Sequence, residues 1–157
     1  MSIHLSGSLA YDRIMTFPGH FEDHILPEKL HILNVCFLIE RIEEKRGGTA
    51  GNIAFNLALM KERPRICATV GKDFEEYARA LEGLGLPLDG IRRLSQNFTA
   101  CAYITTDKQG NQITGFSPAA MNTPCDPAFL PDVKPGDWAV VAPGNMDDML
   151  TLPELYR

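Results

Sequence analysis

The sequence predicts an α/β protein with a mostly parallel sheet flanked by helices and a small antiparallel β lid. Two observations lead to this prediction. From residue 47 onward, apolar strand-type segments alternate with amphipathic helix-type segments, a pattern typical of βαβ units. Three segments do not fit that alternation, and their strand or hairpin character predicts an antiparallel group: residues 11–17, 32–42 and 99–116.

The composition is that of a globular protein and argues against several classes of partner. Of the 157 residues, 45% are hydrophobic and 22% are charged, which is enough apolar material for a core without disulfide or metal support. The net charge of −5 argues against a surface for nucleic acid or for anionic membranes. No apolar run approaches the roughly 20 residues of a membrane span. We therefore expect neither a nucleic-acid nor a membrane partner.

The cysteines and the N-terminus are typical of a cytoplasmic protein. The four cysteines are widely spaced without a C-x-x-C pair, which favours reduced structural thiols. No basic segment followed by a long apolar stretch opens the sequence, so no secretory signal is visible. His20 and His24 have the spacing of a metal pair, but no third ligand stands at a convincing distance. The prediction is a cytoplasmic protein without a metal site of its own.

The first half of the chain is expected to contain three strands and one helix. Residues 3–5 form a short strand, and residues 11–17 form a second that ends at a Pro-Gly pair. Residues 32–42 are mostly apolar, and periodicity alone does not separate helix from strand there. We favour a strand, because it could pair with residues 11–17. A Gly-rich turn then opens a helix whose predicted buried stripe is Ile53, Leu57 and Met60.

The second half continues the alternation. Residues 66–70 are largely apolar, as expected for a strand covered on both faces. Asp73 begins a helix with Phe74, Tyr77, Ala78 and Leu81 on one side. The sequence DKQGN between residues 106 and 112 predicts a hairpin turn. Residues 138–142 form another buried-type strand. Residues 151–157 look like the start of a helix, so we expect further chain to follow.

The Gly-rich turn at residues 47–52, GGTAGN, is the strongest local candidate for ligand contact. Glycines allow the backbone to approach a ligand closely, and the free N–H groups of the following helix would face that ligand. The turn matches neither G-x-x-x-x-G-K-[ST] nor G-x-G-x-x-G, so it is no standard nucleotide loop. An ordinary strand-to-helix turn is the competing interpretation.

Asp12 and Asn52 are the polar candidates near that turn. Asp12 lies just past the first strand, close to the strand ends at which open α/β sheets bind ligands. A carboxylate there can accept two hydroxyl hydrogen bonds, although an Asp that caps a turn would give the same pattern. Asn is a poor residue for a helix, which favours a ligand-facing Asn52. Asn56, one turn later, is expected at the surface.

The ordered motifs of the whole chain resemble the N-terminal half of the ribokinase (PfkB) family of sugar and nucleoside kinases. The matching segments are GSLAYD at 7–12, GGTAGNIAFNLA at 47–58, ATVGKDF at 68–74, LEGLG at 81–85 and TACAY at 99–103. Residues 17–42 and 112–121 look most like bacterial adenosine kinases. The resemblance implies that residues 1–157 are the N-terminal portion of a single ribokinase-like domain. Its lid strands would come from about residues 11–45 and 98–118.

The resemblance also implies a set of site residues. Asp12 and Asn52 would bind ribose hydroxyls, and the lid would cover the base and exclude water. A homodimer could form through the lid sheet. The implied substrate-binding residues are Ser8, Asp12, Gly47, Gly48, Asn52, Ala100 and Phe116, and Asn145 would lie toward the phosphates.

One family signature is missing from this sequence. A Gly-Ala-Gly-Asp-like turn carries the catalytic base and a helix N-terminus that stabilises the transferring phosphoryl group. The resemblance therefore implies an ATP-dependent parent kinase that phosphorylates the 5′-hydroxyl of a nucleoside, with adenosine as the first expectation. ATP and Mg²⁺ would be bound mostly by the missing half, and the isolated chain is expected to be inactive. The alternatives are a ribose- or fructose-type sugar kinase and a non-catalytic nucleoside-binding or dimerisation module.

Overall fold

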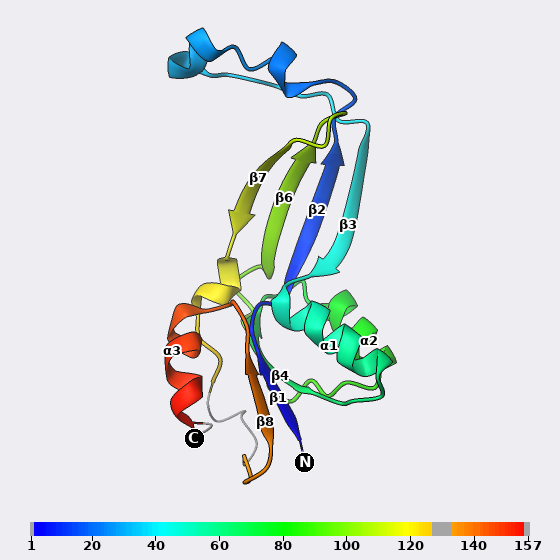
Figure 1. Ribbon diagram of the computed structural model, residues 1–157, viewed down its shortest axis with the longest axis vertical. Coiled ribbons are helices and arrows are strands. Elements are labelled where there is room, and N and C mark those ends of the chain that lie inside the picture. The colour runs from blue at the N-terminus through cyan, green and yellow to red at the C-terminus, as the bar shows by residue number, and fades with distance from the viewer. Residues whose placement is uncertain (1, 127–132, 156–157) are drawn as a thin grey trace. The chain divides into compact units, whose positions relative to one another are not determined.

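A computed structural model describes residues 2–126 and 133–155 (Figure 1). The chain divides into two compact units. Unit 1 contains Met1–Tyr11, Arg46–Cys101 and Ser117–Arg157, and unit 2 contains Asp12–Lys45 and Ala102–Phe116. Within the two described ranges, no helix is long and apolar enough to cross a membrane.

Unit 1 is built on a parallel sheet. Its strands are β1 (Ile3–Ser6), β4 (Arg65–Val70), β5 (Ile91–Arg93) and β8 (Trp138–Val141), in the order β5-β4-β1-β8. Leu5 of β1 pairs in register with Ile66 of β4 and with Val140 of β8, and each neighbouring pair is parallel. The parallel order confirms the predicted α/β architecture, although the sequence analysis did not predict the three-residue strand β5.

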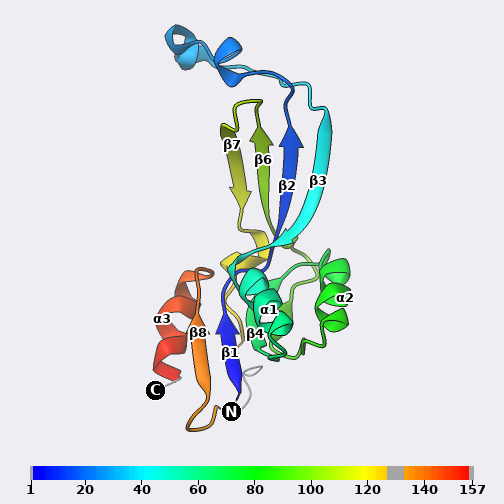
Figure 2. The same ribbon diagram turned by 45° about the vertical axis from the view of Figure 1, so that its right-hand side comes forward.

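Helices cover both faces of this sheet. The helices α1 (Thr49–Leu59) and α2 (Glu75–Gly83) lie together in Figure 2, and α3 (Met146–Leu155) lies on the other side of β8 and β1. Alternate side chains of β4 explain the arrangement. Ile66, Ala68 and Val70 belong to the main core with α1 and α2, whereas Cys67 packs with Leu152 of α3. Residues 66–70 are therefore a strand covered on both faces, as predicted.

Unit 2 contains a mixed four-stranded sheet. Its strands are β2 (Ala10–Thr16), β3 (Arg41–Gly47), β6 (Ala100–Thr106) and β7 (Gln112–Ser117), in the order β3-β2-β6-β7. In Figure 1 the outer pairs run antiparallel, as expected, and the central pair β2–β6 runs parallel. The predicted hairpin connects β6 and β7. Asp107 closes its turn by accepting the backbone N–H groups of Gln109 and Asn111, each at 2.9 Å.

The prediction of a strand over residues 32–42 is wrong for most of its length. The structure has a 3₁₀ helix at Pro27–Ile32, irregular backbone after it, and β3 only from Arg41. Phe37 explains the departure, because its ring packs 4.8 Å from that of Phe17 and 5.0 Å from that of Phe21. Side-chain packing thus holds the segment without strand pairing, and Leu38 remains 84% exposed.

Helix α2 buries the predicted side chains, whereas on α1 the predicted Ile53 and Leu57 are only half-buried and the fully buried residues are others. Phe74, Tyr77, Ala78 and Leu81 are all buried. On α1 the buried residues are Ala50, Gly51 and Ala54, and Met60 is 64% exposed. The small residues face the core because the Tyr77 hydroxyl lies directly against Gly51 and leaves no room for a larger side chain. At Gly51, therefore, the small volume of the residue and not its hydrophobicity accounts for its burial.

The C-terminal elements also differ from the sequence predictions. Residues 138–142 do contain a strand, but β8 is the edge of the sheet, and Trp138 is 63% exposed. The following helix begins at Met146, well before residue 151, because the Asn145 side chain accepts the backbone N–H of Asp147 at 2.9 Å. An amide at that position caps the helix.

Stability in acid is expected to depend on Asp137. Its carboxylate accepts the backbone N–H groups of Ser2 at 2.6 Å and Lys134 at 3.1 Å, and these bonds lower its pKa to about 2. A lowered pKa stabilises the fold above the unfolded value of about 4, and the contribution is lost as the pH falls from there toward 2. The Asp137→Asn variant should therefore unfold at a lower urea concentration at pH 7. Its free energy of unfolding should also decrease less between pH 4 and pH 2 than that of the unaltered protein. An unchanged slope in that window would contradict this role.

Candidate functional site

Three loops of unit 1 meet at the carboxyl ends of β1 and β8 and at the start of α1. Ser8 follows β1, Thr49 begins α1, and Pro143 follows β8. The Ser8 backbone N–H donates to the Pro143 carbonyl and to Thr49 Oγ1, both at 3.1 Å. The Thr49 backbone N–H donates to Ser8 Oγ at 2.9 Å, and the Thr49 hydroxyl donates to the Pro143 carbonyl. The loops are therefore fixed to one another by polar contacts at the ligand-binding edge of an α/β sheet.

Glycine makes this close approach of loops possible. A Cβ on Gly48 would lie 2.5 Å from the Ser8 carbonyl oxygen and 2.8 Å from the Ala10 nitrogen. Gly48 also has φ 87° and ψ 150°, a region essentially restricted to glycine. On the β8 side, a Cβ on Gly144 would lie 2.9 Å from the Gly7 carbonyl carbon. Backbone polar groups and the N-terminus of α1 thus lie together with little side-chain cover.

Asn52 lies in the first turn of α1 and is exposed. Its backbone N–H donates to the Gly48 carbonyl at 3.0 Å, and its carbonyl accepts the Asn56 side-chain amide at 2.8 Å. The Asn52 side chain itself makes no hydrogen bond to any described residue. It is therefore available to a ligand at the start of the helix, while Asn56 binds its own helix.

In unit 2, Asp12 is a half-buried carboxylate on β2 with no hydrogen-bond or ion-pair partner among the residues that the structure describes. Burial raises its pKa above the usual value for Asp. Its neighbour Arg13 donates to Glu44 at 2.8 Å and to Tyr103 at 3.1 Å. Because strand side chains alternate, Asp12 lies on the opposite face of this sheet from those three. An ionised carboxylate placed in this way can accept hydrogen bonds from ligand hydroxyls.

The remaining predicted site residues differ in their burial and in their hydrogen bonds. Gly47 is buried, and its carbonyl accepts the Tyr77 hydroxyl at 2.8 Å. Ala100 has no exposed surface, so its side chain offers nothing to a ligand in this structure. Phe116, on β7 of unit 2, is 52% exposed. Asn145 donates through its side-chain amide to the Met121 carbonyl at 2.9 Å and caps α3, so the loop itself uses both side-chain atoms.

The sequence analysis missed Thr49 and Pro143. Thr49 could have been found, because a hydroxyl residue directly after a Gly-rich turn is typical of a helix start. Pro143 contributes only its carbonyl, and nothing in the sequence marks that contact. Of the histidine pair considered as metal ligands, His24 packs edge-on against Phe17 at 5.2 Å. Within residues 2–126 and 133–155, no cluster of three or more His, Cys, Asp or Glu side chains could hold a metal ion.

Comparison with known proteins shows the family of the chain. The family model described as pfkB family carbohydrate kinase matches residues 13–142. The chain belongs to this family. A curated PfkB relative, the nucleoside kinase of Methanothermobacter thermautotrophicus, is 30% identical over 112 residues, which cover 69% of this chain and 36% of that protein.

Solved structures show the same ribokinase-like fold. The nucleoside kinase of Burkholderia thailandensis in complex with inosine is 35% identical, with a TM-score of 0.75, and the match covers 98% of this chain and 48% of that one. The nucleoside kinase of Methanocaldococcus jannaschii is 25% identical with a TM-score of 0.78 and the same coverage. The chain therefore spans about half the length of the kinases that it resembles.

Proposed function

We propose that this chain is the substrate-binding, N-terminal portion of an ATP-dependent kinase that phosphorylates the 5′-hydroxyl of a nucleoside, with adenosine as the first candidate and inosine as the second. The observation that carries the proposal is Asp12, a half-buried carboxylate without a partner among the described residues. Leaving a carboxylate in this state costs free energy unless a ligand supplies hydrogen-bond donors. The resemblance to nucleoside kinases, one of them solved with inosine, supports the ribose hydroxyls of a nucleoside as these hydrogen-bond donors.

The proposal gives each part of the candidate site a separate role. Asp12 accepts the ribose hydroxyls, and Asn52 contributes a further hydrogen bond from the first turn of α1. Ser8 and Gly48 present backbone groups that a sugar can approach closely, since Gly48 carries no side chain, whereas Gly47 is buried and remains a prediction. Phe116 would contribute apolar surface for a base, and Ala100 remains a prediction without an exposed side chain. Positioning of this kind is the main contribution of protein to phosphoryl transfer.

ATP and Mg²⁺ are part of the proposal, but the described residues do not fit a magnesium site. Mg²⁺ is bound by carboxylates together with substrate phosphates, and no acidic cluster of that kind occurs in the described ranges. The Asn145 side chain, which we predicted near the phosphates, is already engaged in capping α3. We therefore assign the metal and most of the ATP site to the part of the relatives' fold that this chain does not span.

A second candidate function, a dimerisation module, rests on the exposed apolar side chains of unit 2. Leu30, Ile32, Leu33 and Leu38 are all more than half exposed. Leu26, Ile32 and Leu33 also line an open hollow of about 110 Å³. Apolar surface of this kind is typical of protein interfaces. The kinase proposal accommodates it as a homodimer contact through unit 2, and a cytoplasmic location suits the free thiols.

Calorimetry and a kinase assay on the isolated chain test the proposal. We expect adenosine and inosine to bind more tightly than ribose, and we expect no ATP-dependent formation of AMP or IMP. Tighter binding of ribose would favour a sugar kinase. Detectable turnover by the pure chain would overturn the claim that it provides positioning alone.

A chimera provides the catalytic test. Fusing residues 1–157 to the C-terminal half of the Burkholderia thailandensis nucleoside kinase should yield ATP-dependent phosphorylation of inosine. A matched chimera with Asp12→Asn should lose most of that activity, whereas Glu44→Gln, on the opposite face of the same sheet, should retain it. A folded chimera that binds nucleoside without turnover would favour the non-catalytic module.

A further inference from the structure

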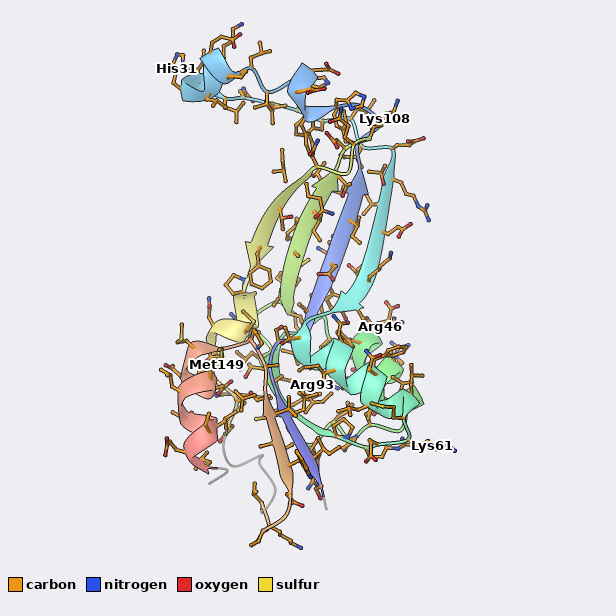
Figure 3. All side chains as sticks on the ribbon, viewed as in Figure 1. His31, Arg46, Lys61, Arg93, Lys108 and Met149 are labelled. Atoms are coloured by element: carbon orange, nitrogen blue, oxygen red, sulfur yellow. The ribbon has the colours of Figure 1, made fainter. Side chains whose placement is uncertain are left out.

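Three short segments of unit 1 contact one stretch around the start of α2. They are the C-terminal end of Met1–Tyr11 and the two ends of Arg46–Cys101. Figure 3 labels Arg46, the residue before Gly47 near the end of β3. Asp12 follows the first of these segments directly in the chain, and Gly48 lies within the second, so a contact that fixes either segment also fixes the backbone next to a candidate site residue.

Tyr77 holds the segment that begins at Arg46. Its hydroxyl donates to the Gly47 carbonyl at 2.8 Å, and both residues are buried. The ring of Tyr77 packs 5.2 Å from that of Phe74 and 5.7 Å from that of Tyr11. A buried hydroxyl bonded to a backbone carbonyl fixes that carbonyl more firmly than packing alone, because losing the donor would leave it unsatisfied.

Asp73 holds the other two segments. Its carboxylate Oδ1 accepts the backbone N–H of Thr99 at 2.7 Å, two residues before Cys101. Its backbone carbonyl accepts the Tyr11 hydroxyl at 3.1 Å. The Thr99 hydroxyl in turn accepts the backbone N–H of Gly71 at 3.0 Å. Asp73, just before α2, therefore bonds to two segments: the one that precedes β6 and the one that contains the start of β2.

Two glycines leave room for the groups that make these bonds. A Cβ on Gly51 would lie 1.9 Å from the Tyr77 hydroxyl. A Cβ on Gly71 would lie 2.2 Å from the Phe98 carbonyl carbon and 2.4 Å from the Thr99 nitrogen. Glycine is a poorer helix former than alanine, so the close contact with Tyr77 gives a reason for its presence at position 51 in α1.

We propose that Asp73 and Tyr77 are positioning residues, which we call the border clamp, that fix the three segments where they reach the edge of unit 1. Through Tyr11 the clamp sets the backbone that leads directly into Asp12. Through Gly47 it sets the backbone of Gly48, whose carbonyl accepts the Asn52 N–H. The clamp itself needs no contact with a ligand, and it acts on the site through these neighbours.

Hydrogen exchange of the isolated chain tests the clamp without any ligand. Tyr77→Phe should accelerate exchange about fivefold to tenfold at residues 46–50, as expected for the loss of one buried hydrogen bond, and leave β4 unchanged. Asp73→Ala should do the same at residues 98–102, and Asp73→Asn, which keeps an acceptor, should restore most of the protection. Tyr103→Phe is the matched control for a hydroxyl outside the clamp and should change neither region.

Two outcomes would overturn the clamp. Equal acceleration in β4 and at residues 46–50 would mean that Tyr77 contributes only general stability, and no acceleration at residues 46–50 would mean that it holds nothing there. Tyr11→Phe provides a milder variant if Tyr77→Phe fails to fold, with the expected change at residues 8–12.

A second measurement, inosine affinity by calorimetry, rests on the proposed function. Tyr77→Phe should weaken inosine binding about threefold to tenfold, while Tyr103→Phe should not. If the unaltered chain binds no nucleoside, the proposed function fails, and the exchange data still decide whether the clamp exists. If the unaltered chain binds inosine and Tyr77→Phe binds it equally well, the positioning role is overturned.

Discussion

Replacing Gly48 with alanine should destabilise the protein by about 2 to 6 kcal/mol, a large part of the 5–15 kcal/mol of a typical domain. Two costs add. The backbone of Gly48, at φ 87° and ψ 150°, is one that other residues adopt only at about 1–3 kcal/mol. The new Cβ would also lie 2.5 Å from the Ser8 carbonyl oxygen, a backbone atom that hydrogen bonds hold in place, and overpacking costs about 1–3 kcal/mol more. Urea unfolding measures the loss.

Gly83→Ala is the matched control for Gly48→Ala. Gly83 ends α2, and a Cβ there would meet nothing within 4 Å. The substitution should be neutral or stabilise the helix by up to about 1 kcal/mol, because alanine loses less conformational entropy on folding. Equal stability of Gly48→Ala and the unaltered chain would contradict the close approach of the turn to Ser8.

Most of unit 1 could be predicted from the sequence because its signals are local. The apolar residues 66–70 and the spacing of Phe74, Tyr77, Ala78 and Leu81 each specify an element by hydrophobic pattern alone. The buried face of α1 could not be predicted in this way. It depends on the Tyr77 hydroxyl lying against Gly51, a contact between two helices that no local pattern records. A prediction based on hydrophobicity places the largest apolar side chains in the core, whereas the fully buried residues of α1 are Ala50, Gly51 and Ala54.

Unit 2 was harder to predict, because contacts distant in sequence decide its form. The apolar segment at residues 32–42 has the composition of a strand, yet the rings of Phe17 and Phe21 engage Phe37 and leave the backbone irregular. The actual strand β3 has the charged sequence RIEEKRG. An ion pair supports its pairing with β2: Arg13 Nε of β2 lies 2.8 Å from Glu44 Oε2 of β3. A charged strand at the edge of a sheet is common, but its sequence gives no periodic apolar signal.

The candidate site was predicted in outline by residue type, and its geometry required the structure. Asp12 and the Gly-rich turn could be chosen because they follow predicted strands, at the strand ends where open α/β sheets bind ligands, although turn-forming roles would give the same pattern. The hydrogen bonds that join Ser8, Thr49 and Pro143 could not be predicted, because each residue takes part through a backbone group that most residues carry, and Pro143 through its carbonyl alone. The sequence also did not show that the Asn145 side chain caps α3, and its predicted position toward the phosphates stays a prediction.

Asp12→Asn should weaken nucleoside binding by a factor of about 10 to 100. The substitution preserves size but removes the charge, and a hydrogen bond to a charged group contributes about 1.5–3 kcal/mol. The fold should be little affected, because Asp12 has no bonded partner among the described residues and its burial raises its pKa, so the charged form is costly in the free protein. Calorimetry with adenosine and inosine measures the affinity, and Glu44→Gln is the control carboxylate.

The pH dependence of binding separates a direct role of the Asp12 charge from a steric one. If the ionised carboxylate accepts the ribose hydroxyls, affinity is full above the raised pKa of Asp12 and falls as the pH drops through it. Asp12→Asn should bind weakly at every pH, because an amide has no charge to lose in that range. Parallel pH profiles for the two proteins would show that the carboxylate does not bind the ligand in its ionised form. If the affinity of the unaltered protein instead falls to that of Asp12→Asn at acid pH, the negative charge of Asp12 is what binds the hydroxyl donors of the ligand.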